Sequence, residues 1–204
     1  MLRFERICKA YGAQRVLRDV GHHFSAGAFA LRGPNGVGKS TLLAVLAGAE
    51  EADSGAIWID GQPLHQQPVA AKARLAYAPD ECPVYPFMRG RELLQFVAFA
   101  RGCELTPEVM RIAARFGLEP HLDTRFGDMS LGTQKKMMLA AAWIGDPVVM
   151  LLDEPSNGLD AAARVALGEL LKARAERGVV LISTHDSEFA QSVGAAVIEF
   201  ADLA

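Results

Sequence analysis

The sequence has few cysteines, no marked excess of charge of either sign and no long hydrophobic run. Its three cysteines, Cys8, Cys82 and Cys103, form no C-x-x-C pair, which is typical of inert thiols in a reducing cytoplasm. The net charge is −3, so the composition does not indicate sequence-independent binding of nucleic acid. No apolar stretch approaches the roughly 18 residues needed to cross a bilayer, and no signal-peptide pattern opens the chain. We expect a soluble protein that reaches a membrane only through a partner.

One loop in this chain predicts a phosphate-binding site. It fits the pattern G-x-x-x-x-G-K-[ST] and consists of Gly33, Pro34, Asn35, Gly36, Val37, Gly38, Lys39 and Ser40, followed by Thr41. A short apolar strand candidate, Phe29–Leu31, precedes the loop, and a helix candidate, Leu42–Ala47, follows it and stops at Gly48. Backbone N–H groups at the helix N-terminus favour phosphate binding. Lys39 would reach the β- and γ-phosphates, and the Ser40 hydroxyl would bind Mg²⁺.

The order of periodic segments predicts an α/β core that a helical segment interrupts. Residues 1 to about 31 read as short strands, and Ala56–Ile59 reads as a strand closed by an Asp60-Gly61 turn. Amphipathic helices are predicted over residues 91–101 and from Thr106, an N-cap followed by proline. Helices and strands then alternate over Thr133–Ile144, Val148–Leu152, Ala161–Arg177 and Val179–Ser183.

Two adjacent acids follow the most apolar of these strands. Val148–Leu152 is apolar on both faces, which is typical of a central strand in a parallel sheet, and Asp153 and Glu154 follow it directly. Ligands bind at this end of parallel strands. Asp153 would hold Mg²⁺, and Glu154 would polarise a water for attack on the γ-phosphate. The alternative, a solvated acidic turn, is less favoured because charges at a core edge are costly.

The loop and the acids, with further motifs, resemble those of an ABC-type ATPase, the nucleotide-binding subunit of an ATP-binding cassette transporter. Gly33–Ser40 resembles the Walker A motif and Val148–Asp153 the Walker B motif, with Glu154 in the place of the catalytic glutamate. His185 stands in the place of the family's switch histidine, and Tyr11 in the place of an aromatic residue that stacks on adenine. The resemblance implies ATP and Mg²⁺ as ligands, and Glu154, His185 and Lys39 as catalytic groups.

The resemblance extends to the segments that act between two subunits. Met129–Thr133 occupies the place of the signature motif, and Ser156–Asp160 resembles the D-loop, so Asp160 is expected near the nucleotide. Such ATPases pair head to tail, so Ser130 and Gly132 are expected to contact the γ-phosphate bound by a second subunit. That subunit is either a second copy or a homologue. ATP would bring the two subunits together, and hydrolysis would release them from each other. This closure would be the change that the site passes on to a membrane protein.

The sequence departs from the family pattern at three positions. Leu131 replaces the commonest glycine of the signature, and Thr133 stands where glutamine is commonest. Asp80 stands where the family usually has a glutamine that touches Mg²⁺ and the attacking water. A carboxylate can accept from water or bind metal but cannot donate as an amide does. We expect Asp80 to keep a metal-sensing role while adding negative charge near Asp153 and Glu154.

The resemblance implies one domain over residues 1–204, a P-loop NTPase (RecA-like) core with an N-terminal antiparallel β subdomain and an inserted α-helical subdomain. We expect the core over about 1–80 and 132–204 and the insertion over about 81–131. The expected function is ATP hydrolysis that drives a separate membrane permease, an exporter, from the inner face of the cell membrane. The alternatives are a soluble ABC ATPase of translation or DNA repair, a P-loop kinase, and a binding module with weak hydrolysis.

Aromatic residues between Asp80 and the signature suit a protein interface. Tyr85 and Phe87 lie in an apolar segment that, in the family, borders the groove for a coupling helix of the permease. The alternative, that both side chains pack the insertion onto the core, is equally compatible with the sequence.

Overall fold

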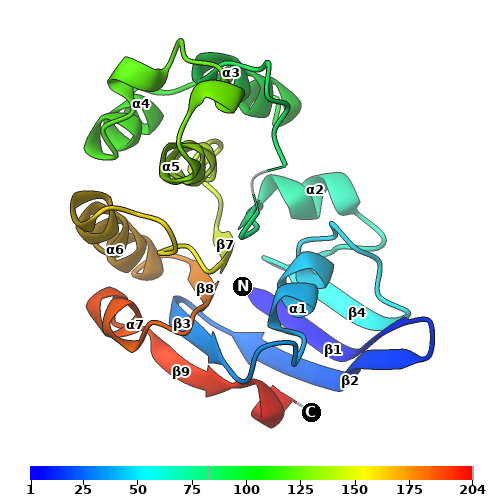
Figure 1. Cartoon of the computed structure of the whole chain (residues 1–204). Coiled ribbons are helices and arrows are strands. Elements are labelled where there is room, and N and C mark those ends of the chain that lie inside the picture. Colours follow the sequence, from blue (N-terminus) through cyan, green and yellow to red (C-terminus); the bar gives the residue numbers. More distant parts are fainter. Residues whose placement is uncertain (82, 204) are drawn as a thin grey trace.

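An antiparallel sheet of four strands, in the order β2-β1-β4-β5, forms one side of the molecule (Figure 1). The computed structural model describes residues 1–81 and 83–203, so Cys82 and Ala204 lie outside the described part of the chain. The strands of this sheet are β1 (Leu2–Tyr11), β2 (Gln14–Phe24), β4 (Ser54–Ile59) and β5 (Gln62–Pro63). Asp60 and Gly61, with φ of 50° and 81°, close the β4–β5 hairpin as the Asp-Gly signal predicted.

A second sheet consists of five parallel strands in the order β6-β7-β8-β3-β9. These are β3 (Gly27–Arg32), β6 (Leu75–Ala78), β7 (Val149–Asp153), β8 (Val179–Ser183) and β9 (Ala196–Glu199). β7 and β8 are buried along their whole length because apolar clusters cover both faces of the sheet. Met150 and Leu152 pack into one cluster, and Val149 and Leu151 pack into the other. The position predicted for the Walker B strand, inside a parallel sheet, is confirmed.

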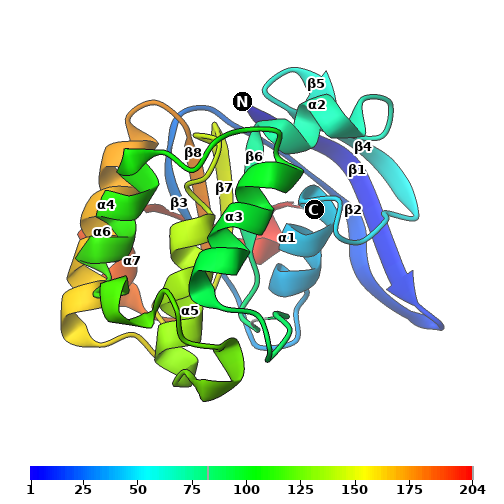
Figure 2. The ribbon, with the colours of Figure 1, turned by 90° about the horizontal axis from the view of Figure 1, so that it is seen from above.

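The helices fall into a group on the core and a group inserted between β6 and β7. They are α1 (Lys39–Leu46), α2 (Pro68–Ala73), α3 (Gly90–Ala100), α4 (Pro107–Arg115), α5 (Leu131–Ala141), α6 (Ala161–Ala175) and α7 (Ser187–Val193), with 3₁₀ turns at Glu119–His121, Phe126–Asp128 and Phe200–Leu203. In Figure 1, α3 and α4 lie far from β1 and β2, and α5 lies between these two helices and the parallel sheet; Figure 2, seen from above, shows α3 and α4 in front of the core. The predicted α/β core with an N-terminal antiparallel sheet and an inserted helical part is confirmed.

Differences from the predicted elements lie at helix ends and in short segments. Helix α5 begins at Leu131 rather than Thr133, because the Ser130 side chain caps it by accepting from the Thr133 N–H. It ends at Ala141, three residues before the predicted end. Helices α2 and α7 and strand β9 had no predicted counterpart.

Candidate functional site

The carboxyl ends of three adjacent parallel strands bring the predicted site together. β7, β8 and β3 are neighbours in the sheet, in that order. The phosphate-binding loop follows β3, Asp153 ends β7, and His185 follows β8 two residues after Ser183. Parallel strands end at the same edge of a sheet, and this edge is where open α/β folds bind ligands. Segments more than 100 residues apart in the sequence therefore face one cavity.

The phosphate-binding loop adopts a conformation that its glycines permit. Gly36 and Gly38 have φ of 76° and 116°, and Gly38 is the N-cap of α1. A Cβ at Gly38 would lie 2.8 Å from Cγ1 of Val16, so a side chain there would meet the end of a neighbouring residue. The buried Lys39 ammonium donates to the carbonyl oxygens of Gly33 at 2.8 Å and Pro34 at 3.0 Å. The loop thus curls around its own lysine at the N-terminus of α1, which is the geometry of an anion site.

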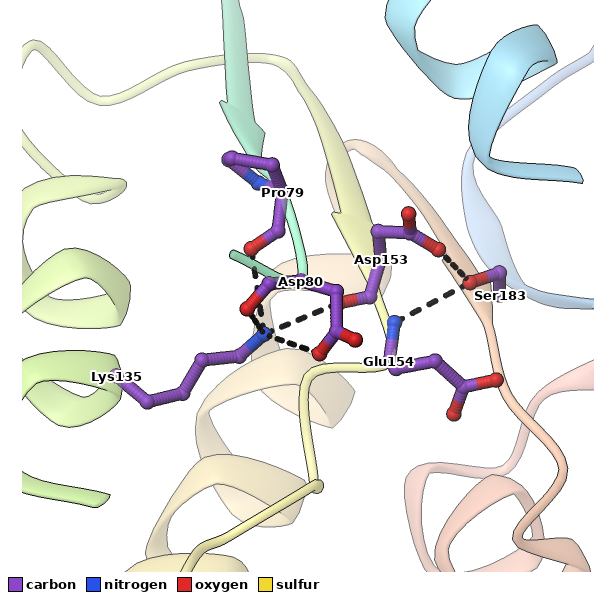
Figure 3. A network of polar contacts seen from close by, with 6 residues as sticks. All are labelled: Pro79, Asp80, Lys135, Asp153, Glu154 and Ser183. Carbon is purple, nitrogen blue, oxygen red and sulfur yellow. Dashed lines mark hydrogen bonds and ion pairs between the residues drawn. The ribbon is translucent and has the colours of Figure 1, made fainter. Parts of the chain in front are cut away.

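Ser183 fixes the two acids at the end of β7 (Figure 3). Its hydroxyl donates to Oδ1 of the buried Asp153. The Glu154 N–H donates to Oγ of Ser183 at 3.2 Å and to its carbonyl oxygen at 3.1 Å. Glu154 has φ of 42°, a conformation that costs a non-glycine residue about 1–2 kcal/mol. These contacts hold the chain in the turn that points the Glu154 side chain away from the Asp153 carboxylate.

Glu154 and His185 form a pair at the same edge of the sheet. Nε2 of His185 lies 3.4 Å from Oε1 of Glu154, whose side chain is largely buried. Burial raises the pKa of Glu154 above its ordinary value, because desolvation penalises the charged form, and the facing His185 partly opposes this shift. A carboxylate with a raised pKa is a better proton acceptor, which suits a general base.

A cavity of about 640 Å³ joins these groups. Ten of the residues predicted from the sequence line it: Asn35, Gly36, Gly38, Lys39, Ser40, Thr41, Asp80, Asp153, Glu154 and His185. Four further residues line it that the sequence reasoning did not assign to the site: Val16, Asn157, Ser183 and Asp186. Ser183 had a usable signal, since it is a polar residue that ends a buried strand. Val16 had none, because a valine within a strand gives no sign of facing a ligand cavity.

The remaining predicted residues lie outside this lining. Ser130 and Gly132 lie at the start of α5, where a Cβ at Gly132 would come within 2.6 Å of the Gly158 carbonyl oxygen. Asp160 is the N-cap of α6 and accepts from the Ala163 N–H at 2.9 Å. In this structure the Ser130 and Asp160 side chains therefore cap helices of their own chain.

Tyr11, Gly33, Pro34 and Val37 complete the set of predicted residues outside the lining. Tyr11 ends β1, is half exposed, and its hydroxyl hydrogen-bonds to Glu50. The Glu50 hydrogen bond and burial raise the pKa of the Tyr11 phenol above its ordinary value. Gly33 and Pro34 act through the carbonyl oxygens that bind Lys39, as described above. Nζ of Lys9 lies over the Tyr11 ring, 5.3 Å from its centroid, and the stacking of Tyr11 on adenine stays a prediction.

Asp80 lines the cavity and also contacts the helical insertion. It follows β6, and its Oδ1 lies 3.1 Å from Nζ of Lys135 on α5. Nothing in the sequence assigned a role to Lys135. The structure buries its ammonium at the ends of β6 and β7.

The donor set suits Mg²⁺ delivered with a nucleotide. Ser40, Asp80 and Asp153 offer hard oxygen ligands around the cavity. Among residues 1–81 and 83–203, no group of three or more His, Cys, Asp or Glu side chains is arranged to hold a metal ion alone. Mg²⁺ characteristically binds through one or two carboxylates together with substrate phosphates. The residues therefore fit a metal that shares its coordination with phosphate oxygens.

Within the same described ranges, no helix has the length and apolar character that spanning a membrane requires. The longest helix, α6, has 15 residues.

Comparison with curated proteins identifies relatives over nearly the whole chain. The chain is 34% identical over 198 residues to the Nod factor export ATP-binding protein I of Paraburkholderia xenovorans, covering 93% of this chain and 64% of the relative. It is 29% identical over 188 residues to the linearmycin resistance ATP-binding protein LnrL of Bacillus subtilis, covering 90% of this chain and 60% of the relative. The chain thus spans less than two thirds of the length of these relatives.

Solved structures share the fold. An ATP-binding subunit of an ABC transporter superimposes with a TM-score of 0.87 at 31% identity, covering 98% of this chain and 85% of the other. The cassette MJ0796, in a dimeric post-hydrolysis state bound to ADP and Pi, superimposes with a TM-score of 0.84 at 20% identity, covering 98% and 94%. A model of the ABC transporter family matches residues 17–157. The chain therefore belongs to the ABC transporter family, as one of its ATP-binding proteins.

Proposed function

We propose that this protein binds and hydrolyses ATP as the ATPase subunit of an ABC transporter. The observation that carries the proposal is the cavity in which the phosphate-binding loop faces Asp153 and the Glu154–His185 pair. Lys39 and the loop N–H groups would bind the phosphates. Glu154 would accept the proton of the attacking water, and His185 would orient the Glu154 carboxylate. The raised pKa of Glu154 supports its role as the proton acceptor.

The magnesium site would consist of Ser40, Asp153 and Asp80. All three line the cavity beside the phosphate-binding loop. When bound, Mg²⁺ would neutralise charge that develops on the phosphate oxygens. Ser183 would keep the Asp153 carboxylate in place through its hydroxyl.

We propose that the working form is a head-to-tail dimer, of two copies or of this chain with a homologue. Ser130 and Gly132 lie outside the cavity of their own chain, at the N-terminus of α5. A helix N-terminus is an anion site, so a second subunit could offer this end of its α5 to the nucleotide. ATP would then bind between the two chains, with Tyr11 stacked on the adenine. The dimeric state described for the cassette MJ0796, which shares this fold, is consistent with the arrangement.

The decisive variant of the active site is Glu154→Gln. Glutamine keeps the shape of the side chain but cannot accept the proton, so we expect ATP to bind and a stable dimer to accumulate with little turnover. Light scattering after gel filtration with ATP measures the dimer, and phosphate release measures turnover. Lys39→Ala is the matched control, since it should lose both ATP binding and the dimer. Unaltered hydrolysis by Glu154→Gln would refute the assignment of the base.

The proposed partner is a separate permease, which would hold this protein at the inner face of the membrane and export its substrate. The names of the two relatives above, an export ATP-binding protein and a resistance ATP-binding protein, support export. Tyr85 and Phe87 support a docking surface, because they are 66% and 70% exposed and so do not pack onto the core. Their rings stack on each other, with centroids 5.4 Å apart. We further propose that residues 1–204 act as one ATPase domain.

Replacing both aromatic residues tests the docking surface. Tyr85→Ala/Phe87→Ala should fold and bind ATP normally but fail to co-purify with the permease from membranes. Phe99→Ala is the matched control, because Phe99 is 82% exposed on α3 and lies outside the proposed surface. Normal assembly of the double variant would remove this part of the proposal.

A further inference from the structure

Lys135 is a charged residue in a position where charge is costly. Only 4% of this residue is exposed, and its side chain reaches from α5 to the ends of β6 and β7 (Figure 3). Nζ lies 3.2 Å from the Pro79 carbonyl oxygen, 3.0 Å from that of Asp80 and 3.2 Å from that of Asp153. It also lies 3.1 Å from Oδ1 of Asp80. A buried ammonium needs such a set of acceptors to offset its desolvation.

The number of acceptors exceeds the number of protons. An ammonium has three N–H donors, and four oxygens surround Nζ of Lys135. Three of these are backbone carbonyl oxygens: that of Asp153 ends β7, and those of Pro79 and Asp80 directly follow β6. The fourth belongs to the Asp80 side chain, which is 51% exposed and can rotate. Lys135 can therefore lose the Asp80 carboxylate and still satisfy all three donors.

The same carboxylate is needed elsewhere in the proposed mechanism. Asp80 lines the cavity with Ser40 and Asp153, the other proposed magnesium ligands. A carboxylate that binds Lys135 through Oδ1 is restrained from turning fully toward that cavity. In the described part of the chain, Lys135 forms one ion pair, and its partner is Asp80. A metal ion bound in this cavity would therefore compete with Lys135 for the Asp80 carboxylate.

We propose that Lys135 is a positioning residue that holds the Asp80 carboxylate away from the metal position and gives it up when the nucleotide's magnesium binds. This inference rests on the proposed function, since it assumes a magnesium nucleotide in the cavity. The exchange links the site to α5, because Lys135 lies on that helix five residues after Ser130, its N-cap. Binding of the magnesium nucleotide in the cavity thus alters the Asp80 contact of Lys135 on α5, the helix that presents Ser130 to the second subunit.

Metal affinity tests the competition directly. Mn²⁺ replaces Mg²⁺ and is titrated against the protein with a non-hydrolysable ATP analogue, with free Mn²⁺ measured by electron paramagnetic resonance. Lys135→Gln should tighten Mn²⁺ binding about fivefold, equivalent to about 1 kcal/mol, because Asp80 is no longer held. Asp80→Asn should weaken Mn²⁺ binding, and the double variant should match Asp80→Asn alone.

The double variant separates this competition from a general effect of charge. If Lys135→Gln tightens metal binding equally in the presence and absence of the Asp80 carboxylate, the loss of a positive charge that repels the metal explains the result and the inference is wrong. Lys136→Gln removes a charge from the adjacent position, where Nζ pairs with Asp160 at 3.0 Å, and should leave metal affinity unchanged. Unchanged or weaker binding in Lys135→Gln also overturns the inference.

A second measurement uses wild-type Lys135 and does not depend on the folding of its variant. The ¹⁵N resonance of the Lys135 ammonium, assigned through its own side-chain carbons, should shift when Mg²⁺ and the ATP analogue are added. In Asp80→Asn the shift should be absent, and an equal shift there would overturn the inference. If wild-type protein with the analogue binds no divalent metal, the proposed function fails instead.

Discussion

Replacing Gly38 by alanine combines two separate costs at one position of the phosphate-binding loop. The backbone of Gly38 has φ of 116° and ψ of 11°, a conformation that non-glycine residues rarely adopt. Its added methyl group would also lie 2.8 Å from Cγ1 of Val16, 3.3 Å from the Val16 carbonyl oxygen and 3.2 Å from Cζ of Phe200. Gly36 offers a matched comparison, since it has φ of 76° and nothing within 4 Å of the added methyl group.

The magnitudes follow from these two environments. Strained backbone of this kind costs about 1–3 kcal/mol, and forcing an extra methyl group into a packed site costs about 1–3 kcal/mol. We expect Gly38→Ala to lower the free energy of unfolding by about 3 kcal/mol, after the small gain from a stiffer unfolded chain. Gly36→Ala should lose only about 1 kcal/mol. For a chain of this size, the Gly38 change corresponds to a fall in Tm of about 6–12 °C.

Urea unfolding of the nucleotide-free protein, followed by far-UV circular dichroism, measures both values. Val16→Ala removes Cγ1 and should reduce the cost of Gly38→Ala by about 1 kcal/mol, because the new methyl group at position 38 no longer meets that atom. The strain at Gly38 should remain in that background. The reasoning is refuted if Gly38→Ala costs no more than Gly36→Ala, or if Val16→Ala leaves the cost unchanged.

Three further predictions test single contacts of the site. Because burial raises the pKa of Glu154 above its ordinary 4.5, stability from its neutral form is present below that value and lost as pH rises through the folded pKa. Glu154→Gln should therefore unfold at higher urea than wild type at neutral pH, with the difference vanishing at acidic pH. Asp160→Ala should lower the free energy of unfolding by about 1 kcal/mol by removing the cap of α6, whereas Asp160→Asn should cost much less. Asp80→Ala should lower the ATPase rate and change its Mg²⁺ dependence; unchanged values of both would remove the metal role of Asp80.

Local chemistry determined the parts of the fold that the sequence predicted well. β8 runs over Val179–Ser183 as predicted, because an apolar run between polar boundaries has little freedom to shift. Helix α4 begins at Pro107 after the Thr106 cap, as the cap-and-proline signal indicated. β9, over Ala196–Glu199, could not be predicted, since it is mostly exposed and exists only through pairing with β3. Helix α7 had a usable signal, the Asp186 cap whose side chain accepts from the Phe189 N–H.

The motif residues of the site could be predicted from the sequence, whereas the contact of Lys135 with Asp80 could not. Lys135 and Lys136 are neighbours on one helix, so they point in directions about 100° apart, yet the sequence alone does not say which one faces the core. The structure buries Lys135, whereas it pairs Lys136 with Asp160 at 3.0 Å. Choosing between them requires the rotation of α5 relative to β6 and β7, which depends on packing over the whole insertion.

The burial of Lys135 also changes the meaning of Asp80. From the sequence, a carboxylate in place of the family's usual glutamine adds negative charge near Asp153 and Glu154. In the structure that charge faces an ammonium 3.1 Å away, so the pair is neutral before any metal binds. A glutamine at position 80 would leave the buried Lys135 without a carboxylate partner. A neutral residue at position 135 would leave the four carboxylates that line the cavity with one fewer counter-charge. Asp80 and Lys135 are therefore best understood as one unit, and the departure from the family pattern at position 80 is explained only together with Lys135.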